Sequence, residues 1–167
     1  PNIGHNALAS LGSRLHLLIT QNVDGLHQMA GTPIEKMVEI HGNTRNVTCL
    51  TCDYEAPMEE ALERVRGGEE DPDCPVCKGL LKSATISFGQ SLVAEDLMKA
   101  QDSIQECDLL LAVGTSLTVS PINQVVPLAH SLSIPILIIN GEKTEYEALA
   151  TLVLHADISS TLLKICE

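Results

Sequence analysis

The stretch that decides how this chain is organised is "VEIHGNTRNVTCLTC", residues 38–52. It begins as an apolar run that ends in His41, and Gly42 follows directly. It then reaches a Cys-x-x-Cys pair at residues 49–52. Apolar strand-like sequence and closely spaced thiols are typical of different kinds of structure. The stretch therefore predicts a junction between two structural units.

Four of the six cysteines form two Cys-x-x-Cys pairs, Cys49 with Cys52 and Cys74 with Cys77. Each pair directs two sulfurs toward one point, and two pairs supply the four thiolates of a closed tetrahedral zinc site. An iron centre or a redox dithiol pair is an alternative use of such spacing. We expect one structural Zn²⁺, for which His41 is not needed as a ligand.

Continuous apolar runs on both sides of the cysteines resemble strands that are buried on both faces. They cover residues 15–20, 38–41, 108–114, 134–140 and 151–156. Helical patterns alternate with them at residues 1–13, 94–106 and 120–132. This alternation predicts an α/β, Rossmann-like parallel sheet.

The spacing of the motifs predicts a discontinuous α/β domain, residues 1–42 and 84–167, with a zinc-binding insert at residues 43–83. Forty residues with one amphipathic helix cannot bury much core, so a metal would supply the missing stability. That helix, at residues 57–68, has an apolar stripe of Met58, Ala61, Leu62 and Val65.

The sequence predicts the buried stripe of one further helix and the N-terminus of another. The helix at 94–106 places Leu97, Met98, Gln101 and Ile104 on one stripe. The helix at 120–132 is predicted to start with Ser120 as its N-cap and Pro121 at its first position.

The net charge of −12 disfavours a nucleic-acid partner, because binding phosphates requires clustered Lys and Arg. A negative charge suits basic partners such as lysine-rich peptides. The alternative interpretation is that it only keeps the surface soluble. The sequence has neither an apolar run of 18 residues nor a secretion signal at its start. We expect no membrane partner and a cytoplasmic location, with the nucleus an option in a eukaryote; the oligomeric state is open.

Polar motifs follow three of the apolar runs. Gln21, Asn22 and Asp24 come after the first, residues 114–116 after another, and Asn140 ends a third. Such groups at the carboxyl ends of parallel strands are typical of a nucleotide crevice. They are also common in turns and caps, and a lone histidine at a strand end is often structural.

Taken together, "TQNVDGLHQMAG", "VEIHG", the two Cys-x-x-Cys pairs, "FGQSL", "VGTSLTVSP" and "ILIIN" resemble the sirtuins in order and spacing. Sirtuins are NAD-dependent protein lysine deacylases. The resemblance covers essentially the whole chain. It implies NAD as cofactor, acylated-lysine proteins or peptides as substrates, and a zinc ion that takes no part in the chemistry.

The resemblance also implies roles for individual residues. His41 would be the general base, Asn22 and Asp24 would receive the nicotinamide end of NAD, and Gln21 would contact its ribose. The remaining cofactor contacts would come from Gly114, Thr115, Ser116, Asn140, Asp157 and Ile158. The acyl-lysine channel and the strands that pair with the substrate would be formed by Ile86, Phe88, Gly89 and Val119.

One departure from the family is large. The family's Gly-Ala-Gly phosphate loop and the strand before it have no counterpart in these 167 residues. We therefore expect a sheet that is incomplete at its N-terminal strand, and weak or no NAD turnover by this chain alone. The alternative function is a module that binds NAD or ADP-ribose, or docks a partner, without catalysis.

Overall fold

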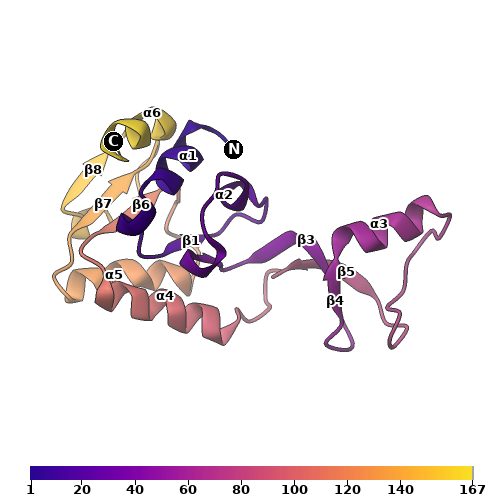
Figure 1. The fold of residues 1–167 in the computed structure, drawn as a ribbon. Coiled ribbons are helices and arrows are strands. Elements are labelled where there is room, and N and C mark those ends of the chain that lie inside the picture. The colour runs from indigo at the N-terminus through magenta and orange to yellow at the C-terminus, as the bar shows by residue number, and fades with distance from the viewer. Residues whose placement is uncertain (167) are drawn as a thin grey trace. The chain divides into compact units, whose positions relative to one another are not determined.

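The computed structural model describes residues 1–166, which Figure 1 colours from indigo to yellow along the chain. The chain divides into two units by its contacts. The first, here the α/β unit, comprises Pro1–Ile19, Leu26–Val38 and Val93–Glu167. The second, here the insert unit, comprises Thr20–Gly25 and Glu39–Leu92. Residues 39–42 and 84–92, which the sequence predicted for the α/β domain, are thus grouped with the insert unit by their contacts. The predicted domain bounds remain a prediction.

The α/β unit is built on a three-stranded parallel sheet. Its strands are β6 (Leu110–Val113), β7 (Ile136–Ile139) and β8 (Leu152–Leu154), in the order β6-β7-β8. Each lies within a run that the sequence predicted as a strand. Their side chains are all aliphatic, as is typical of strands that are covered on both faces.

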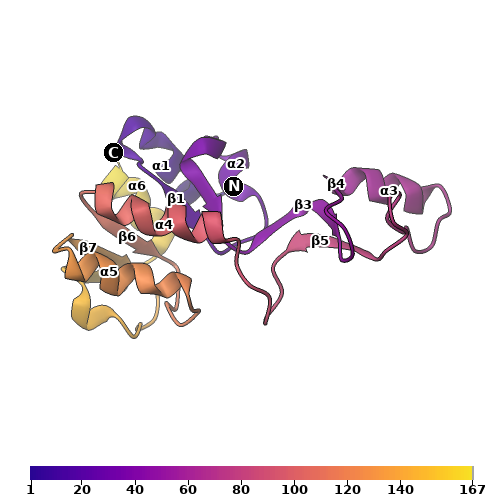
Figure 2. The same cartoon turned by 90° about the horizontal axis from the view of Figure 1, so that it is seen from below.

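Helices cover both faces of this sheet (Figure 1). Helices α1 (Ile3–Ser10) and α6 (Ile158–Cys166) pack against each other on one face. The core there contains Ala7, Ile139, Leu162 and Cys166. On the other face, α5 (Val125–Ser131) contacts β7, and α4 (Ala94–Glu106) lies beside α5, as Figure 2 shows from below.

Strands β1 (Leu18–Thr20) and β2 (Met37–Glu39) form a separate two-stranded sheet. The short helix α2 (Leu26–Met29) lies between them in the sequence. Single turns of 3₁₀ helix complete the connections: η1 (Gly12–Arg14), η2 (Ile34–Lys36), η3 (Ile122–Gln124) and η4 (Glu147–Leu149).

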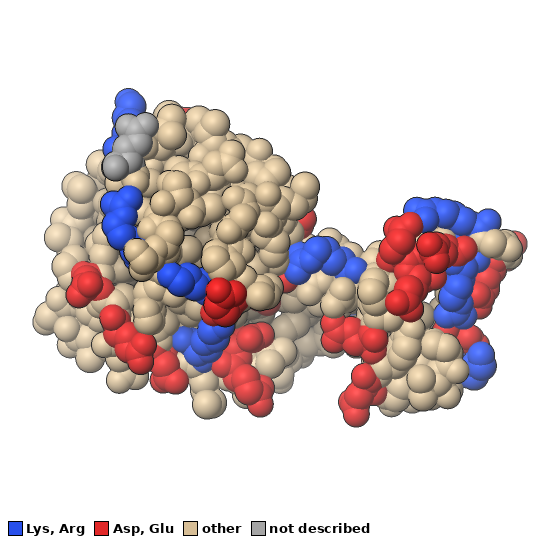
Figure 3. All heavy atoms as spheres, in the orientation of Figure 1, with Lys and Arg blue, Asp and Glu red and all other residues tan. Residues whose placement is uncertain are grey.

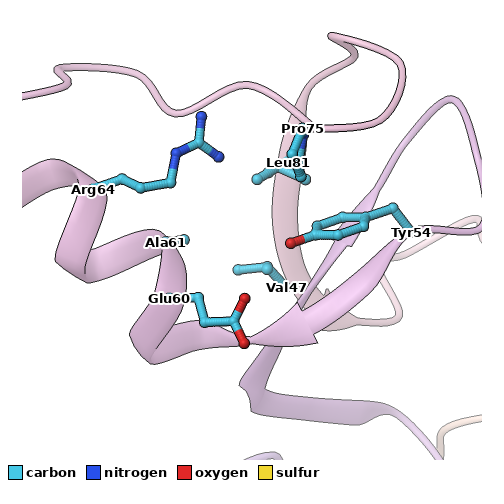
Figure 4. Close-up of a pocket in the computed structure, with 7 residues that line it drawn as sticks. All are labelled: Val47, Tyr54, Glu60, Ala61, Arg64, Pro75 and Leu81. Carbon is cyan, nitrogen blue, oxygen red and sulfur yellow. The ribbon is translucent and has the colours of Figure 1, made fainter.

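The insert unit contains an antiparallel sheet of β3 (Gly42–Cys49), β4 (Glu55–Pro57) and β5 (Leu81–Thr85), in the order β4-β3-β5. Helix α3 (Met58–Arg66) packs against β3. Figure 4 shows side chains of α3 facing those of the sheet across a small pocket lined by Val47, Tyr54, Glu60, Ala61, Arg64, Pro75 and Leu81. The exposed side of α3 is charged, with Arg66 paired to Glu59, and Figure 3 shows acidic and basic groups next to each other there.

The predicted packing of α3 is wrong in part. The helix forms and has Gly67 as its C-cap, but Leu62 is 39% exposed and Val65 45% exposed. Three short strands are too few to cover the whole stripe, so only the side bearing Met58 and Ala61 is partly buried.

Helix α4 has the predicted bounds, but its buried residues are Ala100, Ser103 and Ile104, whereas Met98 is 58% exposed. The predicted start of the helix at 120–132 is wrong. The Ser120–Pro121 peptide is cis, η3 begins at Ile122, and α5 begins at Val125 without a side-chain cap. Pro127 falls in the first turn of α5, where its missing N–H breaks no helical bond.

The fold class is confirmed: this is an α/β protein with a parallel sheet and a four-cysteine insert. Among the described residues, every helix is too short or too polar to cross a bilayer.

Candidate active site and metal centre

The four paired cysteines meet at one point of the insert unit. Their sulfurs all lie within 4.8 Å of one another. Cys49 Sγ is 3.5 Å from Cys77 Sγ, and Cys52 Sγ is 3.7 Å from Cys74 Sγ. Tetrahedral zinc with Zn–S bonds of about 2.3 Å requires sulfurs about 3.8 Å apart. The cluster therefore fits one Zn²⁺ with four thiolates and no open position.

Backbone N–H groups donate hydrogen bonds to two of these sulfurs, which favours the thiolate form that binds a cation. The N–H of Thr51 donates to Cys49 Sγ at 3.3 Å, and that of Gly79 donates to Cys77 Sγ at 3.4 Å. The bond from Thr51 is the main reason why the pKa of Cys49 falls to about 6. Although the N–H of Tyr54 acts in the same direction on Cys52, hydrogen bonding with Cys77 and burial raise the pKa of Cys52 to about 12. Cys52 thus does not ionise readily by itself, and a bound metal would supply the charge that lets it do so.

His41 follows β2 and is joined to the loop of residues 20–25 in the same unit. Its Nδ1 lies 3.2 Å from the carbonyl oxygen of Gln21. Because a carbonyl only accepts hydrogen bonds, Nδ1 carries the proton in this bond. In the uncharged form of the imidazole the lone pair is then on Nε2, which is the arrangement that a general base requires.

Gly42 allows the short connection between β2 and β3 in which His41 lies. It has φ of +72°, and a Cβ there would lie 2.0 Å from the carbonyl oxygen of Ala84 on β5. The carbonyl of His41 accepts from the N–H of Ile86 at 2.9 Å. The backbone that follows the histidine is thus fixed, and the predicted substrate residue Ile86 is brought next to it.

The other predicted substrate residues of the insert unit lie in an open turn after β5. Phe88 is fully exposed, and Gly89 has φ of +87°. Gln90 closes the turn, because its Oε1 accepts from the N–H of Ser87 at 2.8 Å.

The predicted cofactor residues of the α/β unit gather at the carboxyl ends of its parallel strands. Gly114 follows β6 with φ of +59°, and its N–H donates to the carbonyl of Ile139 on β7. A Cβ on Gly114 would lie 3.1 Å from Cδ1 of Ile158. Thr115 Oγ1 accepts from the N–H of Leu117 at 3.2 Å.

Ser116 shares a 2.8 Å hydrogen bond with the hydroxyl of Thr118. The turn is thus rich in hydroxyls at the place where a phosphate or ribose would be held.

Asn140 ends β7 at the same edge. Its Nδ2 donates to the carbonyl of Glu142, and its own carbonyl lies 3.3 Å from Nδ1 of His155. Asp157 precedes α6 and accepts from the N–H of Ser160 at 2.8 Å, which lowers the pKa of its carboxyl. Asp157 is therefore a helix cap as well as a predicted cofactor contact.

Some residues that shape these sites were not predicted. Asn123 is buried, and its Nδ2 donates to the carbonyl of Leu117 at 3.1 Å, while its N–H donates to the carbonyl of Val119. In the insert unit, Glu39, Thr44 and Arg45 contact one another or the loop of residues 20–25. These contacts join residues that neither periodicity nor a motif connects, although Glu39 stands out as a charge at the end of an apolar run.

The predicted site residues thus fall into two groups. The insert unit holds Gln21, Asn22, Asp24, His41, Ile86, Phe88, Gly89 and the four cysteines. The α/β unit holds Gly114, Thr115, Ser116, Val119, Asn140, Asp157 and Ile158.

Comparisons with known proteins point to one family. The Sir2 family model matches residues 1–121. The NAD-dependent protein deacetylase of Thermodesulfovibrio yellowstonii is 37% identical over 169 aligned positions, which cover 100% of this chain and 65% of that protein. NAD-dependent protein deacetylase 2 of Streptomyces coelicolor is 40% identical, with 97% of this chain and 68% of that protein covered. The chain therefore spans about two thirds of the length of these relatives.

Solved structures give the same result. Sir2 bound to an acetylated peptide matches with a TM-score of 0.91 and 27% identity, over 99% of this chain and 69% of that one. A complex of Sir2 with a p53 peptide and NAD⁺ matches with a TM-score of 0.90 and 28% identity, over 99% of this chain and 68% of that one. The chain belongs to the Sir2 family, the sirtuins.

Proposed function

We propose that this chain carries the catalytic histidine of an NAD-dependent protein lysine deacetylase. The observation that supports it most directly is the hydrogen bond from His41 Nδ1 to the carbonyl of Gln21, which leaves Nε2 as the base. The relatives named NAD-dependent protein deacetylase, and a Sir2 structure with an acetylated peptide, support the same reaction for this chain.

NAD, when bound, would supply a ribose carbon that accepts the acyl oxygen of the lysine amide, with nicotinamide as the leaving group. His41 Nε2 would take the proton of a ribose hydroxyl, so that this hydroxyl attacks the acyl carbon. Asn22 and Asp24 would receive the nicotinamide end, and Gln21 would contact the ribose. With one water consumed, which adds to the acyl carbon as the lysine amine leaves, the products would be free lysine, nicotinamide and acylated ADP-ribose.

The remaining residues would bind and orient. We propose that Gly114, Thr115 and Ser116 hold the phosphate and ribose portion, and that Asn140, Asp157 and Ile158 hold the adenosine end. Phe88, Gly89, Ile86 and Val119 would receive the acyl-lysine, whose backbone would add as a strand. Zinc on Cys49, Cys52, Cys74 and Cys77 would be structural, since four thiolates leave it no position for a substrate.

A reducing compartment such as the cytoplasm fits these cysteines. All six are free thiols in the structure, and thiolate zinc ligands must stay reduced. We propose a cytoplasmic location, with the nucleus an option in a eukaryote.

The test is nicotinamide release from NAD in the presence of an acetyl-lysine peptide, measured on the whole protein. We expect the steady-state rate of release to fall by at least about 100-fold in His41→Ala, because turnover then waits for the later step that needs the base, and a general base contributes about 10²–10⁴ to the rate. Matched NAD binding in both proteins is the control. Tight NAD binding with no release by the wild-type protein would instead identify a binding module.

A further inference from the structure

Three side chains of the insert unit, Glu39, Thr44 and Arg45, connect the loop of residues 20–25 to the backbone on either side of His41. We propose that they position this loop, which carries Asn22 and Asp24, for the deacetylation reaction. They are positioning residues and not catalytic ones, and the proposal rests on the function proposed above.

Thr44 holds the middle of the loop. Both its N–H and its hydroxyl donate to the carbonyl oxygen of Val23, at 3.1 and 3.0 Å. A carbonyl oxygen has two lone pairs, so these two donors use its full capacity. Val23 lies between Asn22 and Asp24 in the sequence. The backbone from which these two side chains project is thus fixed to β3.

Arg45 holds the end of the loop. Its guanidinium forms a bidentate pair with Glu39, with Nη1–Oε1 at 2.9 Å and Nη2–Oε2 at 2.5 Å. The same guanidinium covers Gly25, where a Cβ would lie only 2.7 Å from Nη1. Gly25 has φ of +73°, so both its conformation and the contact with Arg45 favour glycine.

A β-bulge explains how two successive residues reach one loop. Side chains alternate between the two sides of a regular strand, so Thr44 and Arg45 would point in opposite directions. The register of β3 against β5 shifts between Gly42 and Val47. Asn43 Oδ1 stabilises the irregular segment by accepting from the N–H groups of Arg45 and Asn46, both at 3.0 Å. Bulges next to active sites commonly redirect side chains in this way.

The exposure of the ion pair indicates what it contributes. The Arg45 side chain is 42% exposed and that of Glu39 11% exposed. Pairs with one such exposed partner add little to global stability. The effect of Arg45 should therefore appear in the local order of the loop and in NAD use, and not in the melting temperature.

Hydrogen exchange tests the local effect directly. The amide of Thr44 reports on its bond to Val23, and the amide of Cys49, which donates to Tyr54, reports on the rest of the insert. In Arg45→Met we expect the Thr44 amide to exchange about five-fold faster, with Cys49 unchanged. Arg66→Met is the matched control, because Arg66 pairs with Glu59 on the exposed face of α3. Unchanged exchange of Thr44 in Arg45→Met would overturn the proposal.

Steady-state kinetics on the whole protein test the functional effect. Arg45→Met and Thr44→Val should raise KM for NAD several-fold while KM for the acetyl-lysine peptide stays the same, and Arg45→Lys should be intermediate. Equal effects on both KM values, or none, would show that the three residues only support the fold. If the wild-type protein releases no nicotinamide, the proposed function fails, whereas the exchange result still decides whether the loop is held.

Discussion

At the scale of single residues, Gly42 is the position where the backbone around His41 tolerates least change. Alanine there would have to adopt φ of +72° and place its Cβ 2.0 Å from a backbone oxygen of β5. We expect Gly42→Ala to destabilise the protein by about 1–3 kcal/mol from conformation alone, with the steric clash adding to this. Urea unfolding measures the loss, and faster exchange of the Ile86 amide would locate it.

Gly31 provides a matched control for this prediction. It also has a positive φ, +94°, but a Cβ there would meet nothing within 4 Å. Gly31→Ala therefore measures the conformational cost by itself. Equal destabilisation by the two variants would show that the contact between Gly42 and β5 has no importance.

At the scale of secondary-structure elements, the turn between β6 and α5 depends on a side chain of η3. Asn123 is 8% exposed, and its amide donates to the carbonyl of Leu117, which has φ of +58°. Asn123→Ala leaves this buried carbonyl without its donor, at a cost of about 1–3 kcal/mol. Thermal unfolding checks the prediction, with the exposed Gln124→Ala as control. A loss in Gln124→Ala as large as that in Asn123→Ala would contradict it.

The elements also show how far the sequence determines the structure. Five of the eight described strands (β1, β2, β6, β7 and β8) and the bounds of α4 could be predicted, because continuous apolar runs and helical periodicity reflect burial directly. The cap of the helix at 120–132 could not, since Ser120 precedes a cis proline and a 3₁₀ turn that propensity does not encode. The contacts of Thr44 and Arg45 with the loop of residues 20–25 could not be predicted either, because a bulge brings together residues that are about 20 positions apart in the sequence.

At the scale of the whole molecule, we expect the stability of the insert unit to depend on a metal held by its four cysteines. Its buried residues between 43 and 83 are only Val47, Cys49, Ala56 and Cys74, and two of these are metal ligands in the zinc site proposed above. Hydrophobic burial of this extent cannot stabilise 40 residues. We expect a strong chelator to remove about one zinc per chain and to unfold the insert, which the amide spectrum of residues 43–83 would report. Cys74→Ser should have the same effect without chelator, whereas a folded, active Cys74→Ser protein would contradict a structural role for the metal.

The pairing of β3 with β5 also makes this region suitable for protein engineering. Strand β3 begins at Gly42 and β5 ends at Thr85, and these two residues are partners in the sheet. At the far end, Arg64 binds both Glu69 and Asp73, so it closes the short segment between them. A closed loop can be lengthened at little entropic cost, about 0.6 kcal/mol for each doubling. A fluorescent reporter domain spliced between Glu70 and Asp71 should therefore leave zinc content and nicotinamide release unchanged, giving a way to follow the protein without a terminal fusion.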